Sequence, residues 1–183
     1  MGRKEFEQFL NTKDEEPEKK FDPEKEIESW KYYLNELYSM IQSWLKKYVE
    51  NGKVKLDFIE KNIHEEHLGY YKVQSMRLYI HHKLVLFDPI GTIIIGTKGR
   101  VDVKGKKGVI KLVLADKKSA RPKINIKVFT GDDEKNEYEE KKKIEEQKEP
   151  DWVWKIATSA PNITYMELNE DSFFELVMDL INE

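Results

Sequence analysis

Five basic residues lie close together where glycine-containing turns interrupt a run of short apolar segments. They are Lys98, Arg100, Lys104, Lys106 and Lys107. Basic side chains gathered on one surface raise the local concentration of an anionic partner. The wider stretch from Gly91 to Val128 has eleven basic and two acidic residues, in a chain whose net charge is −3. We therefore predict that these five side chains form a basic hairpin rim that binds an anion.

The kind of anion decides between two classes of function. We predict a non-catalytic protein-interaction module, a regulatory or accessory protein of a prokaryotic system whose partner is a protein with an anionic surface. The alternative is a nucleic-acid-binding protein that uses the same turns, with Lys104, Lys106 and Lys107 against the phosphates. From Gly91 to Val128 the sequence has no aromatic residue, and stacking aromatics are typical of single-strand binding. In this alternative, backbone contacts are therefore favoured over base recognition.

Two aspartates in the same stretch allow a third hypothesis, a metal-dependent nuclease. Asp102 lies in one predicted strand, and Asp116 ends the next strand and is followed by Lys117 and Lys118. Two carboxylates can hold a divalent metal ion while a lysine positions the attacking water. The hypothesis requires the two carboxylates to approach within about 5 Å, close enough to share an ion. Because Asp116 stands at the end of its strand, a turn is the simpler interpretation.

Two further motifs have spacings that recur in functional sites. His64 and His67 would share one side of a helix and could hold zinc, but no third ligand is evident. We therefore interpret residues Asn62–Gly69 as a polar loop. The turns at Gly96–Gly99 and Gly105–Gly108 join strands, whereas a phosphate-binding loop must open a helix. We predict no bound metal and no cofactor.

The composition narrows the class of protein further. The chain has 183 residues, of which 39% are hydrophobic and 37% charged, so a compact core must coexist with strongly charged segments. It has no cysteine, which excludes disulfides and thiolate sites. The N-terminal sequence carries charges where a secretion signal needs an apolar run, and the longest apolar runs fall far short of the roughly 18 residues that a membrane span requires. We expect a cytoplasmic protein without a membrane anchor.

A long helix is the clearest structural signal. Asp22 can cap its start and Pro23 suits its first position. Apolar residues then recur at alternating spacings of three and four: Ile27, Trp30, Leu34, Leu37, Ile41, Trp44 and Tyr48. Asn51 and Gly52 are typical of a helix end. This pattern predicts a helix with one apolar face, packed across a sheet.

After Gly52 the apolar residues alternate with polar ones, which is typical of strands. The predicted strands are Val54–Phe58, Met76–Phe87 (one strand, or two with a bend near His82), Thr92–Ile95, Val101–Val103, Val109–Leu114, Ile124–Val128 and Trp152–Ile156. Asp88–Gly91 has the composition of a turn. The loops between most of these predicted strands are only a few residues long. Such loops join antiparallel strands, because a connection between parallel strands needs a dozen or more residues.

A second helix is predicted after Asn169, where Leu168 and Phe173 stand at the two positions of a hydrophobic staple. The chain is therefore predicted to be α+β: an antiparallel five- to seven-stranded meander sheet, packed on one face by the long N-terminal helix and the C-terminal helix. Residues 1–21 are expected to form a short helix and a flexible acidic linker. Residues 22–183 are expected to form a single domain with a charged insert at about 130–150. The tryptophans Trp30, Trp44, Trp152 and Trp154 are assigned to its core.

Overall fold

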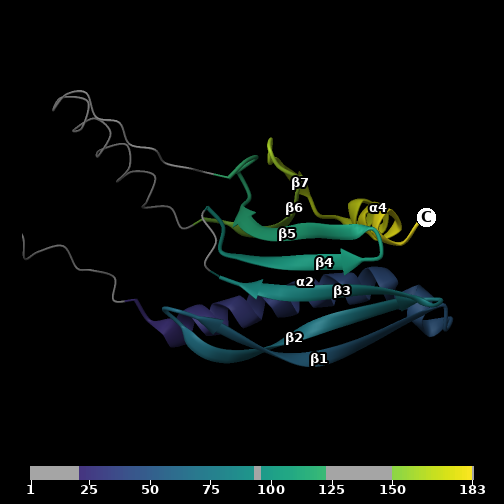
Figure 1. The fold of residues 1–183 in the computed structure, drawn as a ribbon, viewed down its shortest axis with the longest axis horizontal. Helices are drawn as coiled ribbons and strands as arrows, with labels where there is room; N and C mark the ends of the chain where they lie inside the picture. Colours follow the sequence, from purple (N-terminus) through teal and green to yellow (C-terminus); the bar gives the residue numbers. More distant parts are fainter. Residues whose placement is uncertain (1–20, 93–95, 123–149, 183) are drawn as a thin grey trace, which may run out of the picture.

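The structure, a computed structural model, describes residues 21–92, 96–122 and 150–182. In these residues one seven-stranded antiparallel sheet carries a long and a short helix (Figure 1). The elements are α2 (Pro23–Glu50), β1 (Val54–Glu65), β2 (Gly69–Ile80), β3 (Lys83–Gly91), β4 (Gly99–Gly105), β5 (Gly108–Asp116), β6 (Trp152–Ala157), β7 (Tyr165–Glu167) and α4 (Glu170–Ile181). Each strand pairs with the strand before it in the chain. The predicted class, the meander topology and the two helices are confirmed.

Helix α2 has the predicted bounds because its local signals are strong. The Asp22 carboxylate accepts hydrogen bonds from the backbone N–H groups of Glu24 and Lys25, at 3.1 and 3.3 Å. Its buried stripe consists of Trp30, Leu34, Leu37, Tyr38, Ile41 and Leu45. The helix ends before Gly52, whose φ of 68° favours glycine. The stripe packs on the sheet, and Figure 1 shows α2 running behind the strands.

Helix α4 packs against the same face of the sheet as α2. The ring of Phe173 lies 6.3 Å from that of Phe87 in β3 and 5.4 Å from that of Trp44 in α2, measured between ring centroids. The side chain of Asn169 caps α4 and accepts a hydrogen bond from the N–H of Ser172 at 3.0 Å. The helix cover therefore has two pieces that meet over the middle of the sheet.

The β1–β2 hairpin is longer than predicted. Its ladder runs from the pair Val54 and Ile80 to the pair Glu65 and Gly69, so only three residues form the turn. The prediction of a loop over Asn62–Gly69 was wrong at Asn62–Glu65 and at Gly69, which belong to β1 and β2. The polar composition of this segment is typical of a loop, but the alternation of a strand continues through it, and Ile63 is buried.

Strand β3 also extends beyond its predicted end. Residues Asp88–Gly91 were predicted as a turn, yet they continue β3 and pair with β4. The register shifts between Pro89 and Gly91, and a bulge is where a sheet tolerates proline. Of the two alternatives for residues 76–87, the structure has two strands, joined at His81 with a φ of 53°.

The other half of the sheet agrees with the prediction in outline. Strands β4 and β5 form a hairpin, β6 pairs along β5, and the short β7, which was not predicted, pairs with the end of β6. The predicted strand at 124–128, the N-terminal segment 1–20 and most of the charged insert lie outside the described residues. So do three of the four residues predicted as a strand at 92–95.

The core lies between the helices and the sheet. Trp30 and Trp154 are buried in it, and Trp44 and Trp152 pack against it half-buried. Gly99 makes room for Trp30, because a Cβ at Gly99 would lie 2.2 Å from the Cζ3 atom of that ring. In the described part of the chain, neither helix combines the length and apolarity needed to cross a bilayer.

Candidate functional site

Arg100 and Lys104, both predicted rim residues, form ion pairs with carboxylates in the described part of the chain. Val101 and Val103 face the core, so the alternate residues of β4 lie on the face of the sheet away from the helices, here called the open face. There Arg100 donates through Nε and Nη2 to the Asp102 carboxylate, at 2.6 and 2.8 Å. Lys104 Nζ lies 2.6 Å from Oδ2 of Asp88 in β3.

Asp88 also binds a second lysine. Lys61 Nζ in β1 lies 2.5 Å from Asp88 Oδ1 and 2.8 Å from the carbonyl oxygen of Pro89. Burial raises the pKa of Asp88, but the hydrogen bonds from Lys104 and Lys61 outweigh burial, so that its pKa lies below the usual range. The hydrogen bond to Asp102 raises the pKa of Arg100. These groups are therefore charged and bound to one another.

The remaining three rim residues lie at opposite ends of β4. Lys106 and Lys107 form the exposed β4–β5 turn, where the backbone N–H of Lys107 donates to the carbonyl oxygen of Leu180 at 3.3 Å. Lys98 precedes the other end of the strand. Seven strand residues separate the two ends, a span of about 20 Å at roughly 3.3 Å per residue. The structure therefore distributes the predicted rim over two ends and one face of the sheet.

The two aspartates of the nuclease hypothesis are not brought together. Asp102 pairs across β4 and β5 with Lys111, and Asp116 lies five residues further along β5. That separation is about 16 Å along the strand, too far for a shared ion. The Asp116 carboxylate instead accepts the N–H of Lys118 at 3.1 Å, as expected for a turn.

The histidine pair is also divided between two elements. His64 belongs to β1, and its ring stacks on that of Tyr70 at a centroid distance of 4.2 Å. His67 lies in the β1–β2 turn. Across the described residues there is no group of three or more side chains that could hold a metal ion.

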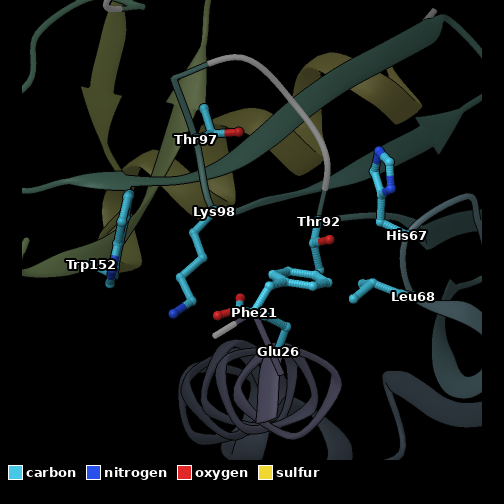
Figure 2. A pocket seen from close by; sticks show the side chains of 8 residues that line it. All are labelled: Phe21, Glu26, His67, Leu68, Thr92, Thr97, Lys98 and Trp152. Atoms are coloured by element: carbon cyan, nitrogen blue, oxygen red, sulfur yellow. The ribbon is translucent and has the colours of Figure 1, made fainter. Parts of the chain in front are cut away.

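A cavity of about 600 Å³ opens beside Lys98, at the end of the sheet where five elements meet. Its walls are Phe21 and Glu26 at the start of α2, His67 and Leu68 of the β1–β2 turn, Thr92 after β3, Thr97 and Lys98 before β4, and Trp152 at the start of β6. Figure 2 shows the Lys98 side chain extending from the sheet toward the start of α2, between Trp152 and Phe21. The surface of this cavity, here called the Lys98 cavity, is mainly apolar.

Lys98 is held by aromatic rings. Its Nζ atom lies 5.7 Å from the ring centroid of Tyr33 and 5.8 Å from that of Trp152, within the range of cation–π contacts. Its backbone N–H donates to the carbonyl oxygen of Leu114 at 2.7 Å, which fixes the start of β4 against β5. Among the residues that the structure describes, no carboxylate forms an ion pair with Lys98.

The wall opposite Trp152 is fixed by Glu65. Its carboxylate accepts a hydrogen bond from the Tyr71 hydroxyl, from the N–H of Thr92 at 3.0 Å and from the Thr92 hydroxyl at 3.0 Å. Burial and the Glu65 carboxylate raise the pKa of Tyr71 well above its usual range. Glycine is required at Gly91, because its φ is 148° and a Cβ there would lie 2.9 Å from Cδ of Glu65. The β1–β2 turn is thus tied to the end of β3.

Of the residues that line this cavity, the sequence predicted only Lys98 as a binding residue. The apolar walls Phe21, Leu68 and Trp152 come from three segments that are distant in the chain. No local spacing relates them, so only the fold brings them together. The cavity has mainly apolar walls with Lys98 and Glu26 as its charged side chains, and beside Lys98 it is suited to a ligand that joins an apolar part to an anionic group.

Comparisons with protein-family models, curated proteins and solved structures gave no match to this chain. Its function is therefore inferred from the chemistry of the Lys98 cavity.

Proposed function

We propose that the protein is a non-catalytic interaction module that binds an acidic segment of a partner protein in the Lys98 cavity. One observation carries the proposal. The Lys98 ammonium group lies at a mainly apolar cavity, between two aromatic rings and without a carboxylate partner among the described residues. Arg100 and Lys104, in contrast, are already paired with carboxylates of the same chain.

The energetics favour a partner with both an acidic and an apolar part. A hydrogen bond between Lys98 and a carboxylate contributes about 1.5–3 kcal/mol where water is partly excluded. Apolar groups that cover the exposed parts of Phe21 and Trp152 add about 25 cal/mol for each Å² removed from water. Loss of the ammonium group is therefore expected to weaken binding by about tenfold to a hundredfold.

Capture of the partner from an extract of the native host tests the proposal. Lys98→Gln keeps most of the side chain and removes the charge, so it is expected to lose a protein that the wild type recovers. The double substitution Lys106→Gln/Lys107→Gln is the matched control at the far end of β4 and is expected to keep that protein. Equal recovery by the wild type and Lys98→Gln would contradict the proposal. Recovery of nucleic acid that the control variant alone loses would favour the nucleic-acid alternative.

A pair of small probes tests the cavity without the partner. Phenylpropionate joins an aromatic ring to a carboxylate, and phenylpropionamide has the same shape without the charge. In an NMR titration we expect the carboxylate to shift the indole N–H signal of Trp152 and to bind about tenfold more tightly than the amide. Equal binding of the two probes, or shifts confined to other tryptophans, would contradict an anion site at Lys98.

A further inference from the structure

Among the described strands, the first half of β6 is paired along one edge only, and its other edge, here called the free edge, lies next to the Lys98 cavity. On one side it pairs with β5 along its whole length, from Trp152 to Ala157. On the other side β7 pairs only with the last three residues of β6. No strand of the described residues lies beside Trp152, Val153 and Trp154 on that side.

The hydrogen bonds at the two ends of β6 show which backbone groups point to the free edge. The carbonyl oxygen of Asp151 accepts the N–H of Lys117 at 2.8 Å, so residue 151 faces the β5 side. Successive residues of an antiparallel strand alternate in direction, which turns Trp152 and Trp154 to the other side. The N–H of Thr158 donates to Thr164 on the β7 side at 2.9 Å, in agreement with this alternation. The N–H and C=O groups of Trp152 and Trp154 therefore point away from β5, to the side on which β7 pairs.

A groove of about 560 Å³ lies between this edge and α2. The indole N–H of Trp154 donates to the carbonyl oxygen of Tyr33 at 2.9 Å and so fixes the distance between strand and helix. Met40 supplies an apolar wall on the helix side, and Glu36 an exposed carboxylate. The Tyr32 hydroxyl donates to that carboxylate at 3.0 Å, which holds it at the groove.

We infer that an extended segment of a partner protein adds to this edge as a further strand, with a basic side chain beside Glu36 and an apolar side chain against Met40. The backbone groups of Trp152 and Trp154 form the ladder, and alternate side chains of the segment face α2. Glu36 makes the groove complementary to a cation, whereas Lys98 in the neighbouring cavity, which shares Trp152 with the groove, is proposed to bind an anion. The inference rests on the proposed function only in taking the partner to be a protein.

Selection of peptides with a displayed random dodecapeptide library tests this inference on the full chain. The library is selected on the wild type and depleted on Trp152→Pro, which removes one N–H of the free edge and no N–H of the β5 ladder. Trp152→Ala is the matched control, because it also removes the indole but keeps the N–H. Peptides that bind the wild type and Trp152→Ala but not Trp152→Pro are expected, with a basic and an apolar residue two positions apart, so that both face α2.

The selected peptides are then N-methylated one residue at a time. Strand addition predicts losses of about tenfold or more at every second residue and little change between them. Peptide binding should also slow the hydrogen exchange of the Trp152 and Trp154 amides, while that of Val153 is slow from the start. This measurement needs no variant and holds even if Trp152→Pro does not fold. N-methylation losses without a period of two, or unchanged exchange at Trp152 and Trp154, would overturn the inference. Lys98→Gln is expected to leave this binding unchanged, so a failure of the Lys98 proposal can be told apart.

Discussion

The carboxylate of Asp88 is the most consequential charge on the open face. It lies between two ammonium groups, 2.5 Å from that of Lys61 and 2.6 Å from that of Lys104, and its side chain is 14% exposed. Asp88→Asn keeps the shape of the side chain and removes the charge. Two ammonium groups then lose their common partner and repel each other.

The size of the effect follows from the exposure of the partners. A buried hydrogen bond to a charged group contributes about 1.5–3 kcal/mol, and an exposed ion pair about 0–1 kcal/mol. The side chains of Lys61 and Lys104 are 31% and 42% exposed, so each bond falls between these limits. We expect Asp88→Asn to lower the free energy of unfolding by about 2 kcal/mol at neutral pH. Glu60→Gln is the matched control, because Glu60 and Lys72 form a 2.7 Å pair that is 54% and 64% exposed, and we expect it to cost about 0.5 kcal/mol or less.

The pH dependence has a definite sign. Because the pKa of Asp88 is lower in the folded chain than in the unfolded one, its stabilisation is fully present above the unfolded pKa of about 3.9 and is lost as the pH falls through the folded pKa. The difference between wild type and Asp88→Asn is therefore expected to stay constant from about pH 8 to pH 5 and to close below about pH 4. Urea unfolding followed by tryptophan fluorescence measures it. Equal costs for Asp88→Asn and Glu60→Gln at neutral pH would refute the reasoning.

Four further substitutions, one of them a control, test the packing, a hydrogen bond between α2 and β2, and the cap of α4 by urea unfolding. Gly99→Ala places a Cβ 2.2 Å from the Trp30 ring and should lower the free energy of unfolding by about 2 kcal/mol. The control is Gly52→Ala, where a Cβ meets nothing within 4 Å, so only the positive φ should cost stability, about 1 kcal/mol. Equal costs for the two substitutions would contradict a steric clash at Gly99. Tyr38→Phe removes a 2.7 Å hydrogen bond to a carbonyl oxygen of β2 and should cost about 1 kcal/mol. Burial also raises the pKa of Tyr38, so its phenol should not ionise in a spectroscopic titration up to about pH 11, and ionisation near pH 10 would contradict its burial. Asn169→Ala removes the cap of α4 and should cost about 1 kcal/mol; an unchanged unfolding midpoint would show that the cap adds no stability.

The elements that the sequence predicted well are those whose signals are local. The cap at Asp22 and the apolar period of α2 lie within one segment, and so does the staple that begins α4. The predicted end of β3, at Phe87, is too early, because the composition of Asp88–Gly91 is typical of turns. Only its pairing with β4, which accommodates Pro89 at a register shift, shows that it is a strand. Strand β7 is three residues long and has too few residues to show a period.

The candidate site was predicted less completely, because its contacts also depend on which strands pair and in which register. Arg100 and Asp102 are two apart on a strand and share a face, so their ion pair had a local signal that the charge count overlooked. The contact of Lys104 with Asp88 depends on the β3–β4 register, which cannot be predicted from the spacing of residues within one strand. A count of basic residues therefore overestimates the charge available to a partner.

The β3–β4 register also gives a physical reason for the basic residues on the open face. Asp88 and Asp102 are direct partners across β3 and β4, and like charges opposite each other destabilise a sheet. Arg100 and Lys104 lie on the same face and neutralise one carboxylate each. These two cations therefore stabilise the pairing of β3 with β4; if both bound a partner instead, Asp102 would lose its ion pair and Asp88 would keep only the one with Lys61. Lys98 differs from them, because the described contacts of its ammonium group are with aromatic rings. Such rings attract a cation without neutralising its charge. Arg100 and Lys104 contact carboxylates and stabilise the sheet, whereas Lys98 contacts aromatic rings and is proposed to bind the partner. The contacts of each cation, and not its position in the basic stretch, distinguish the two roles.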